Sequence, residues 1–468
     1  MDIATVEFGL FCMAGIILFR FRSVIIRRFA LLILNAAFLW ASAGGSALAL
    51  MPTLAFLLLG WVLIGPGPDR KPSVALRVGL ILAAFAYVRG YTVLDDLPKL
   101  PYIYSTLGLS YLLFRILHLV VDRCGGALPR SPGLVDYFGY VLFFPTFVTG
   151  PIQRYDVHRA GLEASPPGDR ETLEAAARIL RGLIKMGVLA VMARWLFDHG
   201  ANAFQQTGLP GARLVLTHGA ASALFCAYMY LNFSGGIDVI MGASRLMGFV
   251  LPENFNRPWR AANILDLWSR WHMSLSDWFR TYLFNPVLKT LAGLGASPKA
   301  MPYLSVGAFF VTFLLMGVWH GTSAMMVVYG LALGGGVSAN KLYQVLMTRR
   351  LGKQRYGRLA KGTVYSTICG GAALAWFTLS LTLLWASPQQ LDIFLSMGGV
   401  LCLGLEMVLL TTAFAALQLV DRLLAALPHR HTAKGIEWRS AMVGLQAFAV
   451  LILLFFVNAP AASVYKGY

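Results

Sequence analysis

Long uncharged stretches separated by short polar connections recur along the whole chain. They run from Phe29 to Pro68, Leu214 to Ile237, Ala300 to Asn340, Gly362 to Leu391 and Ser440 to Tyr465. A membrane-spanning helix needs about 20 apolar residues, so the first and third stretches can each hold two helices. The pattern predicts roughly eleven to thirteen membrane segments and leaves no room for a separate soluble domain.

The apolar run from Val6 to Phe19 opens this series. No basic residues precede it and no small-residue cleavage site follows it, so we expect a retained first helix rather than a cleaved signal peptide.

The series of apolar stretches long enough to span a membrane is interrupted at two places in the middle of the chain. From Gly235 to Val250 the apolar run is too short to cross and a polar segment follows, which predicts a re-entrant segment beside an internal cavity. From Leu267 to Leu283 helical spacing puts aromatic residues on one face and Arg270, Ser274 and Asp277 on the other. This second pattern predicts one amphipathic helix lying at the membrane interface.

Composition supports a membrane protein. Of the 468 residues, 57% are hydrophobic and only 13% are charged, against about a quarter charged residues in soluble domains. The 39 Lys and Arg against 21 Asp and Glu give a net charge of +18. Basic residues cluster in short connections, most densely from Arg349 to Lys361. We therefore interpret the excess of positive charge as a signal that orients the chain in the membrane, and we expect no nucleic-acid partner. The N-terminus is then outside, and the basic loops face the cytoplasm and anionic lipid headgroups.

The side chains that commonly bind metals are scattered. Five cysteines show no Cys-x-x-Cys spacing, and His, Cys, Asp and Glu show no repeated ligand spacing, so we expect neither a disulfide framework nor a metal site. His429 and His431 fall in a basic loop, where solvation is the simplest expectation. Glu406 interrupts an apolar run, and the sequence leaves open whether it is a polar partner inside the helix ring or a contact between helices.

Two histidines stand where apolar residues would be expected. His320 lies within an uncharged stretch between Gly317 and Gly321, and ionisable residues inside a membrane usually face a cavity or a partner. The alternative is a structural histidine that bonds a neighbouring carbonyl at a helix junction. His272 lies among the aromatic residues of the expected amphipathic helix. Asp277 follows it by five residues, a spacing that faces different directions in a continuous helix, so we regard this His-Asp pair as chance.

A histidine near neutrality can take the proton of a hydroxyl group as that group attacks an activated acyl carbonyl. The sequence has no Gly-x-Ser-x-Gly nucleophile motif. Direct transfer from a thioester needs no covalent enzyme intermediate, and binding both reactants in one passage supplies proximity.

Four motifs in order resemble those of the membrane-bound O-acyltransferases. They are Phe143-Phe144-Pro145-Thr146 with Gly150-Pro151-Ile152-Gln153-Arg154-Tyr155, Pro252-Glu253-Asn254-Phe255-Asn256-Arg257-Pro258, Trp271-His272-Met273-Ser274-Leu275-Ser276 with Trp278-Phe279-Arg280, and Gly317-Val318-Trp319-His320-Gly321. More narrowly, the chain is similar to the bacterial branch that includes alginate O-acetylation and D-alanyl transfer proteins.

The resemblance implies an all-α, polytopic membrane protein in which helices form a ring around a central tunnel. It implies a single domain over residues 1–468, with a motif-bearing core at about 143–330 and peripheral helices at 1–130 and 362–468. His320 would be the catalytic base and His272 would line the same tunnel. Further residues in the motifs would bind substrate or donor, with helix capping, loop structure or headgroup contact as alternatives: Arg154, Asn254, Asn256, Trp271, Arg280 and Trp319.

The implied function is transfer of an acyl group, preferably acetyl, to a hydroxyl acceptor for cell-surface polysaccharide modification at the inner membrane. We expect no bound cofactor. The donor would be acetyl-CoA or an acyl carrier protein, and the acceptor a polysaccharide or a periplasmic acyl-accepting protein.

The branch stays open between acetyl and D-alanyl transfer. Gly150-Pro151-Ile152-Gln153-Arg154-Tyr155 favours the D-alanyl proteins, whereas Phe233-Ser234-Gly235-Gly236 favours acetylation. A departure follows the aromatic segment, where Leu283-Phe284-Asn285-Pro286 replaces the short proline-glycine-glycine loop usual in the acetylating proteins. Rivals from other classes are a polysaccharide exporter, with broken helices and midplane polar residues, and a noncatalytic scaffold of a secretion complex.

Overall fold

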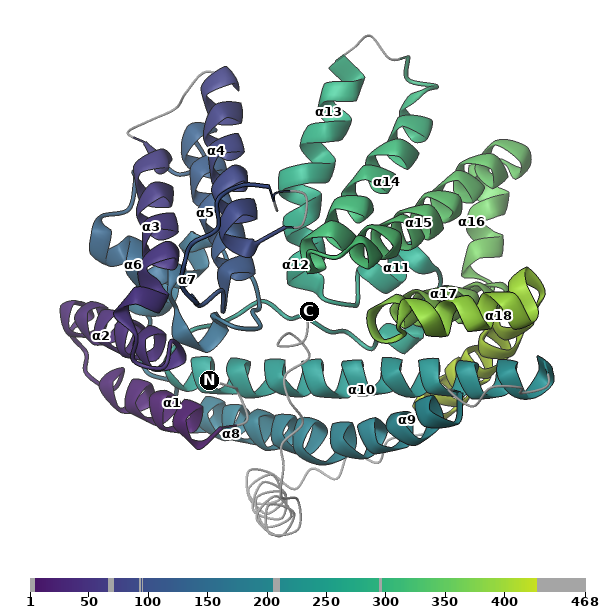
Figure 1. Cartoon of the computed structure of the whole chain (residues 1–468), viewed down its shortest axis with the longest axis horizontal. Helices are drawn as coiled ribbons and strands as arrows, with labels where there is room; N and C mark the ends of the chain where they lie inside the picture. The colour runs from purple at the N-terminus through teal and green to yellow at the C-terminus, as the bar shows by residue number, and fades with distance from the viewer. Residues whose placement is uncertain are drawn as a thin grey trace. The chain divides into compact units, whose positions relative to one another are not determined.

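The computed structural model describes residues 5–65, 71–91, 94, 96–204, 211–293 and 297–426, and these fold almost wholly into helices (Figure 1). Helices account for 80% of these described residues. Over the described residues the only extended pairing is an isolated antiparallel bridge between Phe255 and Trp271. The prediction of an all-α membrane protein is confirmed, whereas the ring of helices and its tunnel stay predictions.

The described residues form two compact units. The first unit contains residues up to 188 and residues 232–252. Its helices are α1 (Val6–Leu18), α2 (Val24–Ser42), α3 (Ala47–Ile64), α4 (Lys71–Arg89), α5 (Leu109–Cys124), α6 (Leu134–Val141), η2 (Phe144–Thr146), α7 (Tyr155–Glu163) and α8 (Asp169–Ile184), which continues into the π-helical η3 (Lys185–Leu189).

The second unit contains residues 189–231 and those from 253 onward. Its helices are α9 (Ala190–Phe204), η4 (Pro258–Arg260), α11 (Ile264–Trp268), α12 (Met273–Phe279), the π-helical η5 (Arg280–Phe284), α13 (Asn285–Gly293), α14 (Met301–His320), α15 (Ala324–Leu351), α16 (Lys353–Lys361), α17 (Thr363–Trp385) and α18 (Pro388–Ala426). Helix α10 (Gly211–Leu246) begins in this unit and ends in the first. The prediction of one domain over the whole chain stays a prediction.

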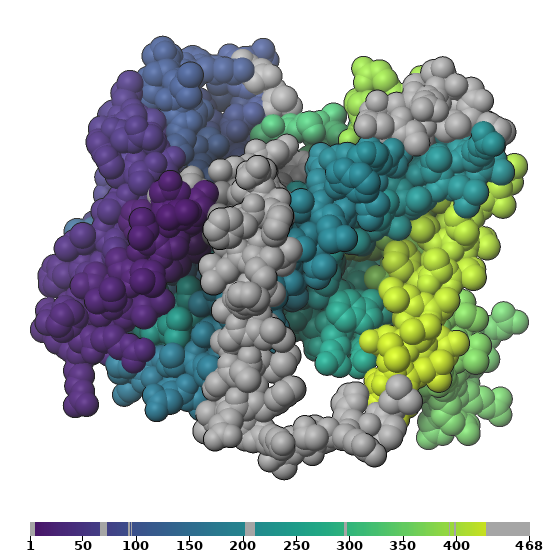
Figure 2. Space-filling view, turned by 90° about the horizontal axis from the view of Figure 1, so that it is seen from below, coloured from purple at the N-terminus to yellow at the C-terminus, as the bar shows by residue number. Residues whose placement is uncertain are grey.

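Six of the described helices are long and apolar enough to cross a membrane: α2, α3, α10, α14, α17 and the part of α18 from Gly399 to Ala426. Their outer faces are apolar, as α18 shows at the surface of its unit (yellow in Figure 2), where Val400 is 84% exposed and Val408 66%. The predicted total of eleven to thirteen also counts shorter helices and the stretch from Ser440 to Tyr465, which lies outside the described residues, as do His429 and His431.

The two longest uncharged stretches each form two helices, as predicted. The first is α2 and α3, which separate at Gly44 and Gly45, where φ is +64° and +74°. The second is α14 and α15, which pack against each other directly (Figure 1). The apolar run near the N-terminus is α1.

The re-entrant segment predicted at Gly235 to Val250 is wrong, because α10 is one helix of 36 residues up to Leu246. Gly235 allows close packing rather than a break, since a Cβ there would lie 2.8 Å from the carbonyl oxygen of Gly182 on α8. Asp238 on the same helix accepts from Arg178 Nε at 2.9 Å and from Lys185 Nζ at 2.7 Å. Asp238, the acidic residue within this run, therefore binds α8 and η3.

The single amphipathic helix predicted from Leu267 to Leu283 is also wrong. The chain forms the short α11, turns at residues 269–272, and continues through α12 into the π-helical η5. Helical periodicity did not indicate this turn, because it is held by a separate loop described below.

Glu406, which the sequence left undecided, forms a contact between helices. Its Oε1 lies 2.6 Å from Nδ1 of His218, joining α18 to α10, and the two side chains are 0% and 3% exposed. The ring of Phe394 stacks on His218 at 4.4 Å between centroids. The carboxylate is therefore a buried polar partner that ties α18 to α10.

Candidate active site

His320 is the last residue of α14, at the junction with α15, and is half-buried. Its Nδ1 lies 2.6 Å from the carbonyl oxygen of Met316, one turn earlier. A carbonyl can only accept, so Nδ1 carries the hydrogen and donates it. The lone pair on Nε2 is then available to accept a proton. The ring thus bonds a neighbouring carbonyl at a helix junction, the alternative that the sequence left open, and its role as a catalytic base stays a prediction.

Glycines let α15 approach the end of α14. A Cβ on Gly317 would lie 2.2 Å from Cα of Gly330, so neither helix could hold a side chain at this crossing. The rings of Trp319 and Tyr329 stand edge-on to His320, with centroids 4.8 Å and 5.6 Å away. The position of His320 is thus fixed by close helix packing and by two aromatic neighbours.

His272 occupies the turn between α11 and α12 and is 2% exposed. Its φ of +45° lies in the left-handed region, which non-glycine residues adopt only when the surroundings impose it. Here the loop before η4 imposes it: the backbone of Asn254 accepts from Met273 N at 3.0 Å, and the side-chain oxygen of Asn254 accepts from Ser274 N at 3.1 Å. The Asn254 side chain therefore caps α12.

The two asparagines of this loop make structural contacts. Asn254 is 0% exposed and holds the His272 turn. Asn256 is exposed and pairs through its backbone, donating to Arg270 O at 2.9 Å and accepting from Arg270 Nη1 at 3.3 Å. Asn254 therefore caps a helix and Asn256 holds the loop together. Helix capping and loop structure are the alternatives that the sequence left open for these residues.

His272 and His320 both belong to the second unit and are close enough for the charge of His320 to act on His272, although 47 residues (273 to 319) lie between them. Burial, and then the charge of His320, lowers the pKa of the His272 imidazole from 6.5 to about 3. His272 is therefore neutral at physiological pH and can form hydrogen bonds without carrying a charge. His272 and Asp277 do not form a His-Asp pair, because His272 is buried, whereas the Asp277 side chain is 63% exposed and bonds Arg280.

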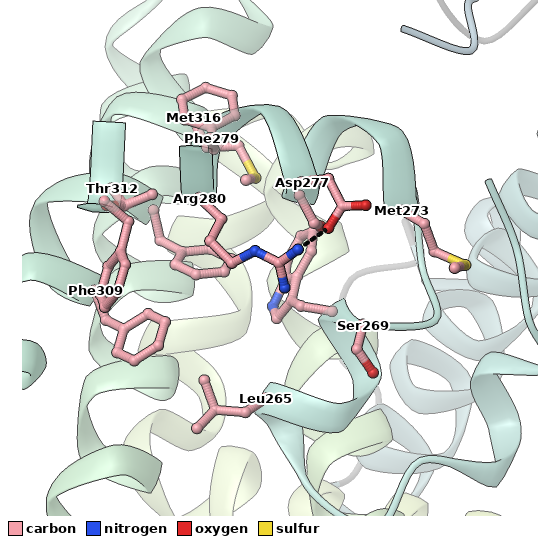
Figure 3. Close-up of a pocket in the computed structure, with 13 residues that line it drawn as sticks. Leu265, Ser269, Met273, Asp277, Phe279, Arg280, Phe309, Thr312 and Met316 are labelled. Atoms are coloured by element: carbon pink, nitrogen blue, oxygen red, sulfur yellow. Dashed lines mark hydrogen bonds and ion pairs between the residues drawn. The ribbon is translucent and has the colours of Figure 1, made fainter. Parts of the chain in front are cut away.

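A cavity of about 360 Å³ lies in the second unit, and its wall includes Met273, which follows His272, and Met316, one turn before His320. Neither histidine is itself part of the wall. The volume is typical of small-molecule sites. Figure 3 shows Phe309, Thr312 and Met316 of α14 on one side, with Asp277 and Arg280 opposite, where Arg280 Nη2 donates to Asp277 Oδ1 at 2.8 Å. The carbonyl of Met316, one of these lining residues, is the acceptor for His320 Nδ1. Arg280, 66% exposed, provides the positive charge at its edge.

Sequence reasoning missed Thr312 and Met316, which face this cavity. They precede His320 at intervals of four residues, so the helical period would have placed all three on one face of α14.

The remaining predicted residues lie elsewhere. Trp271 is buried with its ring against Phe377, at 4.9 Å between centroids, and lines a second, apolar cavity. Arg154 belongs to the first unit, where Nη2 bonds Asp122 Oδ2 at 3.2 Å. The same carboxylate oxygen lies 3.2 Å from His118 Nδ1, and His118 Nε2 accepts from Tyr155 N at 3.1 Å. Buried His118 and partly buried Asp122 thus position the half-exposed guanidinium.

Comparison with known proteins supplies the context. The sequence model of the membrane-bound O-acyltransferase family matches residues 98–381. The teichoic acid D-alanyltransferase of Bacillus subtilis is 32% identical over 234 residues, which are 48% of this chain and 56% of that protein. A probable alginate O-acetylase AlgI of Pseudomonas syringae is 31% identical over 232 residues, 49% of this chain and 42% of that protein. The corresponding Pseudomonas putida protein is 28% identical over 280 residues, 58% and 53% of the two chains. The chain spans about half the length of the curated relatives it matches.

Proposed function

The chain belongs to the membrane-bound O-acyltransferase family, and we propose that it is an enzyme of the inner membrane that moves an acyl group, acetyl by preference, from a cytoplasmic thioester to a hydroxyl acceptor used in cell-surface polysaccharide modification. The observation that carries this proposal is the hydrogen bond from His320 Nδ1 to Met316 O, because it leaves Nε2 as a base at the end of a membrane-spanning helix, one turn beyond the cavity-lining Met316.

The reaction needs one proton to be moved. As the acceptor hydroxyl oxygen attacks the thioester carbonyl, His320 Nε2 takes its proton, and the C–O bond forms. The tetrahedral intermediate then collapses, the C–S bond breaks, and the leaving thiolate takes the proton from the imidazolium. Acceptor ester and free thiol are the products, and the histidine returns to its starting form without a covalent enzyme intermediate.

His272 and Arg280 have supporting roles in this proposal. The neutral imidazole of His272 lies within electrostatic range of His320 and can hydrogen-bond a reactant without repelling the imidazolium formed during transfer. Arg280 at the edge of the 360 Å³ cavity is suited to the phosphates of a donor, because guanidinium groups bind phosphate oxygens bidentately. Trp319 flanks the base, and Arg154, in the first unit, is a further candidate for contact with the donor.

D-alanyl transfer from a carrier protein to a cell-wall polymer is the second candidate. It is supported by the 32% identity to a teichoic acid D-alanyltransferase, against 31% for a probable alginate O-acetylase. The partners would then be a carrier protein in place of coenzyme A, and a polymer or a periplasmic acyl-accepting protein.

Labelled donors distinguish acetyl transfer from D-alanyl transfer. The purified chain in lipid vesicles would receive acetyl-CoA labelled in the acetyl group, or a carrier protein charged with labelled D-alanine, with a polysaccharide acceptor. We expect label from acetyl-CoA to reach the acceptor and the thiol to be released in equal amount. Label from the D-alanyl carrier alone would favour the second candidate, and label from neither donor with folded protein would contradict both.

A further inference from the structure

A second cavity lies in the second unit, apart from the candidate active site. It has a volume of about 440 Å³ and lies between α10, α17 and α18. Its wall is almost wholly apolar, with Ala227, Leu374, Phe377 and Leu417 among its residues, and Trp271 closes it on the side of the His272 turn. No residue lines both cavities. An apolar space of this size suits a hydrocarbon chain better than a polar substrate.

Two arginines lie near the acidic residue in the wall of this cavity. Asp421 is the one charged residue of the wall, and it accepts from Arg260 Nε and, at 3.3 Å, from Trp259 Nε1. Arg257 is exposed and close enough for its charge to act on Asp421. Two guanidinium groups and one carboxylate leave a net positive charge at the rim. This charge is complementary to a phosphate group.

The charged rim lies at the basic end of its helices. Arg422, next to Asp421, donates to Ser366 Oγ at 3.1 Å and to Thr363 O at 3.4 Å, in the first turn of α17. That turn directly follows α16, whose residues Lys353, Arg355, Arg358 and Lys361 are exposed. Basic connections face the cytoplasm, where the leaflet carries anionic lipids.

We propose that this cavity binds one acyl chain of an anionic phospholipid, with the lipid phosphate against Arg257 and Arg260. The chain would pack on Leu374, Phe377 and Leu417 and end at Trp271. Because Trp271 directly precedes His272, a bound lipid also supports the turn that carries this histidine. The site does not depend on acyl transfer, since it would exist in an exporter or a scaffold as well.

Lipid binding to the full-length protein tests the proposal. Protein stripped of lipid in detergent is titrated with phosphatidylglycerol or with phosphatidylcholine of the same chains, and bound lipid is counted by native mass spectrometry. We expect one phosphatidylglycerol to bind first, about fivefold tighter than phosphatidylcholine, the effect of one cation near an anionic headgroup.

Two variants test the binding of the acyl chain and the binding of the headgroup separately. Ala227→Trp fills the cavity and should abolish the single tight site, whereas Leu405→Trp, at a position of α18 that is 52% exposed and outside the cavity, should keep it. Arg257→Gln changes an exposed residue, so the protein should fold, and it should remove the preference for phosphatidylglycerol.

Three results would overturn the proposal. One is the absence of a tight lipid site in the wild-type protein. The second is unchanged binding to folded Ala227→Trp. The third is equal affinity for both lipids together with no effect of Arg257→Gln, and this last measurement remains decisive if Ala227→Trp does not fold.

Discussion

What a histidine can do depends on which of its ring nitrogens is already bound to the protein. Nδ1 of His320 donates to Met316 O, and this fixes the tautomer with Nε2 as the acceptor. His272 makes a different contribution, because burial keeps it neutral beside the first ring. One base and one neutral neighbour form the arrangement from which we argue acyl transfer.

Replacing His320 by alanine tests this arrangement. We expect acyl transfer to fall by about 100-fold or more, the size of a lost general base. Export or scaffolding would largely survive the same change. The measurement is transfer of label from the thioester in vesicles containing equal amounts of folded protein.

His199→Ala is the matched control, because His199 Nδ1 also bonds a carbonyl four residues earlier, that of Trp195 at 2.8 Å, but the residue is exposed on α9. It should leave transfer unchanged. Transfer by His320→Ala at the rate of this control would remove the base assignment.

Acid stability tests the burial of His272. Its pKa in the folded protein is about 3, below the ordinary 6.5, so below pH 6.5 the unfolded chain binds a proton that the folded chain does not. This contribution to stability is full above pH 6.5 and is lost as the pH falls toward 3. His272→Gln should therefore reduce the loss between pH 7 and 5 by about 2 kcal/mol. Unfolding is followed at both pH values, with His199→Gln as the exposed control. Equal pH dependence of wild type and His272→Gln would mean that the ring is solvated.

At the scale of elements, the site depends on two close approaches between segments distant in sequence. One is the crossing of α14 and α15 at Gly317 and Gly330. The other is the loop before η4, whose Asn254 caps α12 and holds the His272 turn.

Gly317→Ala should push α14 and α15 apart. Its Cβ would meet the backbone of Gly330, so we expect a loss of about 1–3 kcal/mol of stability from overpacking, together with reduced transfer as His320 moves. Gly307→Ala on the same helix meets nothing within 4 Å and should be neutral or stabilising by up to about 1 kcal/mol. Thermal unfolding and transfer rates are measured for both, and similar behaviour of the two variants would contradict the tight crossing.

Asn254→Ala should loosen the contact between the loop before η4 and the His272 turn. Loss of a helix cap costs about 1 kcal/mol, and here it also leaves Ser274 N without its acceptor beside His272. Asn256→Ala, two residues away and exposed, keeps its backbone pairing with Arg270 and should change stability by less than about 0.5 kcal/mol. The comparison is made by thermal unfolding, and equal losses would show that capping is not what holds this turn.

For the molecule as a whole, charge and hydrophobicity are distributed to suit a membrane. Apolar side chains cover the outer faces of the spanning helices, and the net charge of +18 is concentrated in connections such as α16. In the proposed function, this distribution would attract an acidic donor to the face that carries α16.

Donor binding should therefore depend on salt. Raising ionic strength from about 0.01 M to 1 M shortens the screening length from about 30 Å to 3 Å, and we expect the donor KM to rise several-fold. The double change Arg355→Gln and Arg358→Gln on α16 should weaken this dependence. Arg20→Gln with Arg22→Gln removes the same charge in the first unit and should have less effect. A donor KM that does not change with salt would count against electrostatic recruitment.

Sequence alone determined the features that the lipid environment enforces. The two helices in each of the stretches Phe29 to Pro68 and Ala300 to Asn340 follow from the need to satisfy every backbone group within a hydrocarbon layer. The family motifs likewise identified His320 and His272 as candidates. For these features the physical constraint is local, so the pattern of residues carries it.

Tertiary structure decided how the segments meet. The left-handed turn at His272 exists because Asn254, outside the predicted helix, caps α12. Helix α10 continues past Gly235 because α8 packs closely against it and neutralises Asp238. Glu406 finds His218 across 187 intervening residues (219 to 405). Each outcome depends on a partner far away in the chain, and neither helical period nor hydropathy contains that partner.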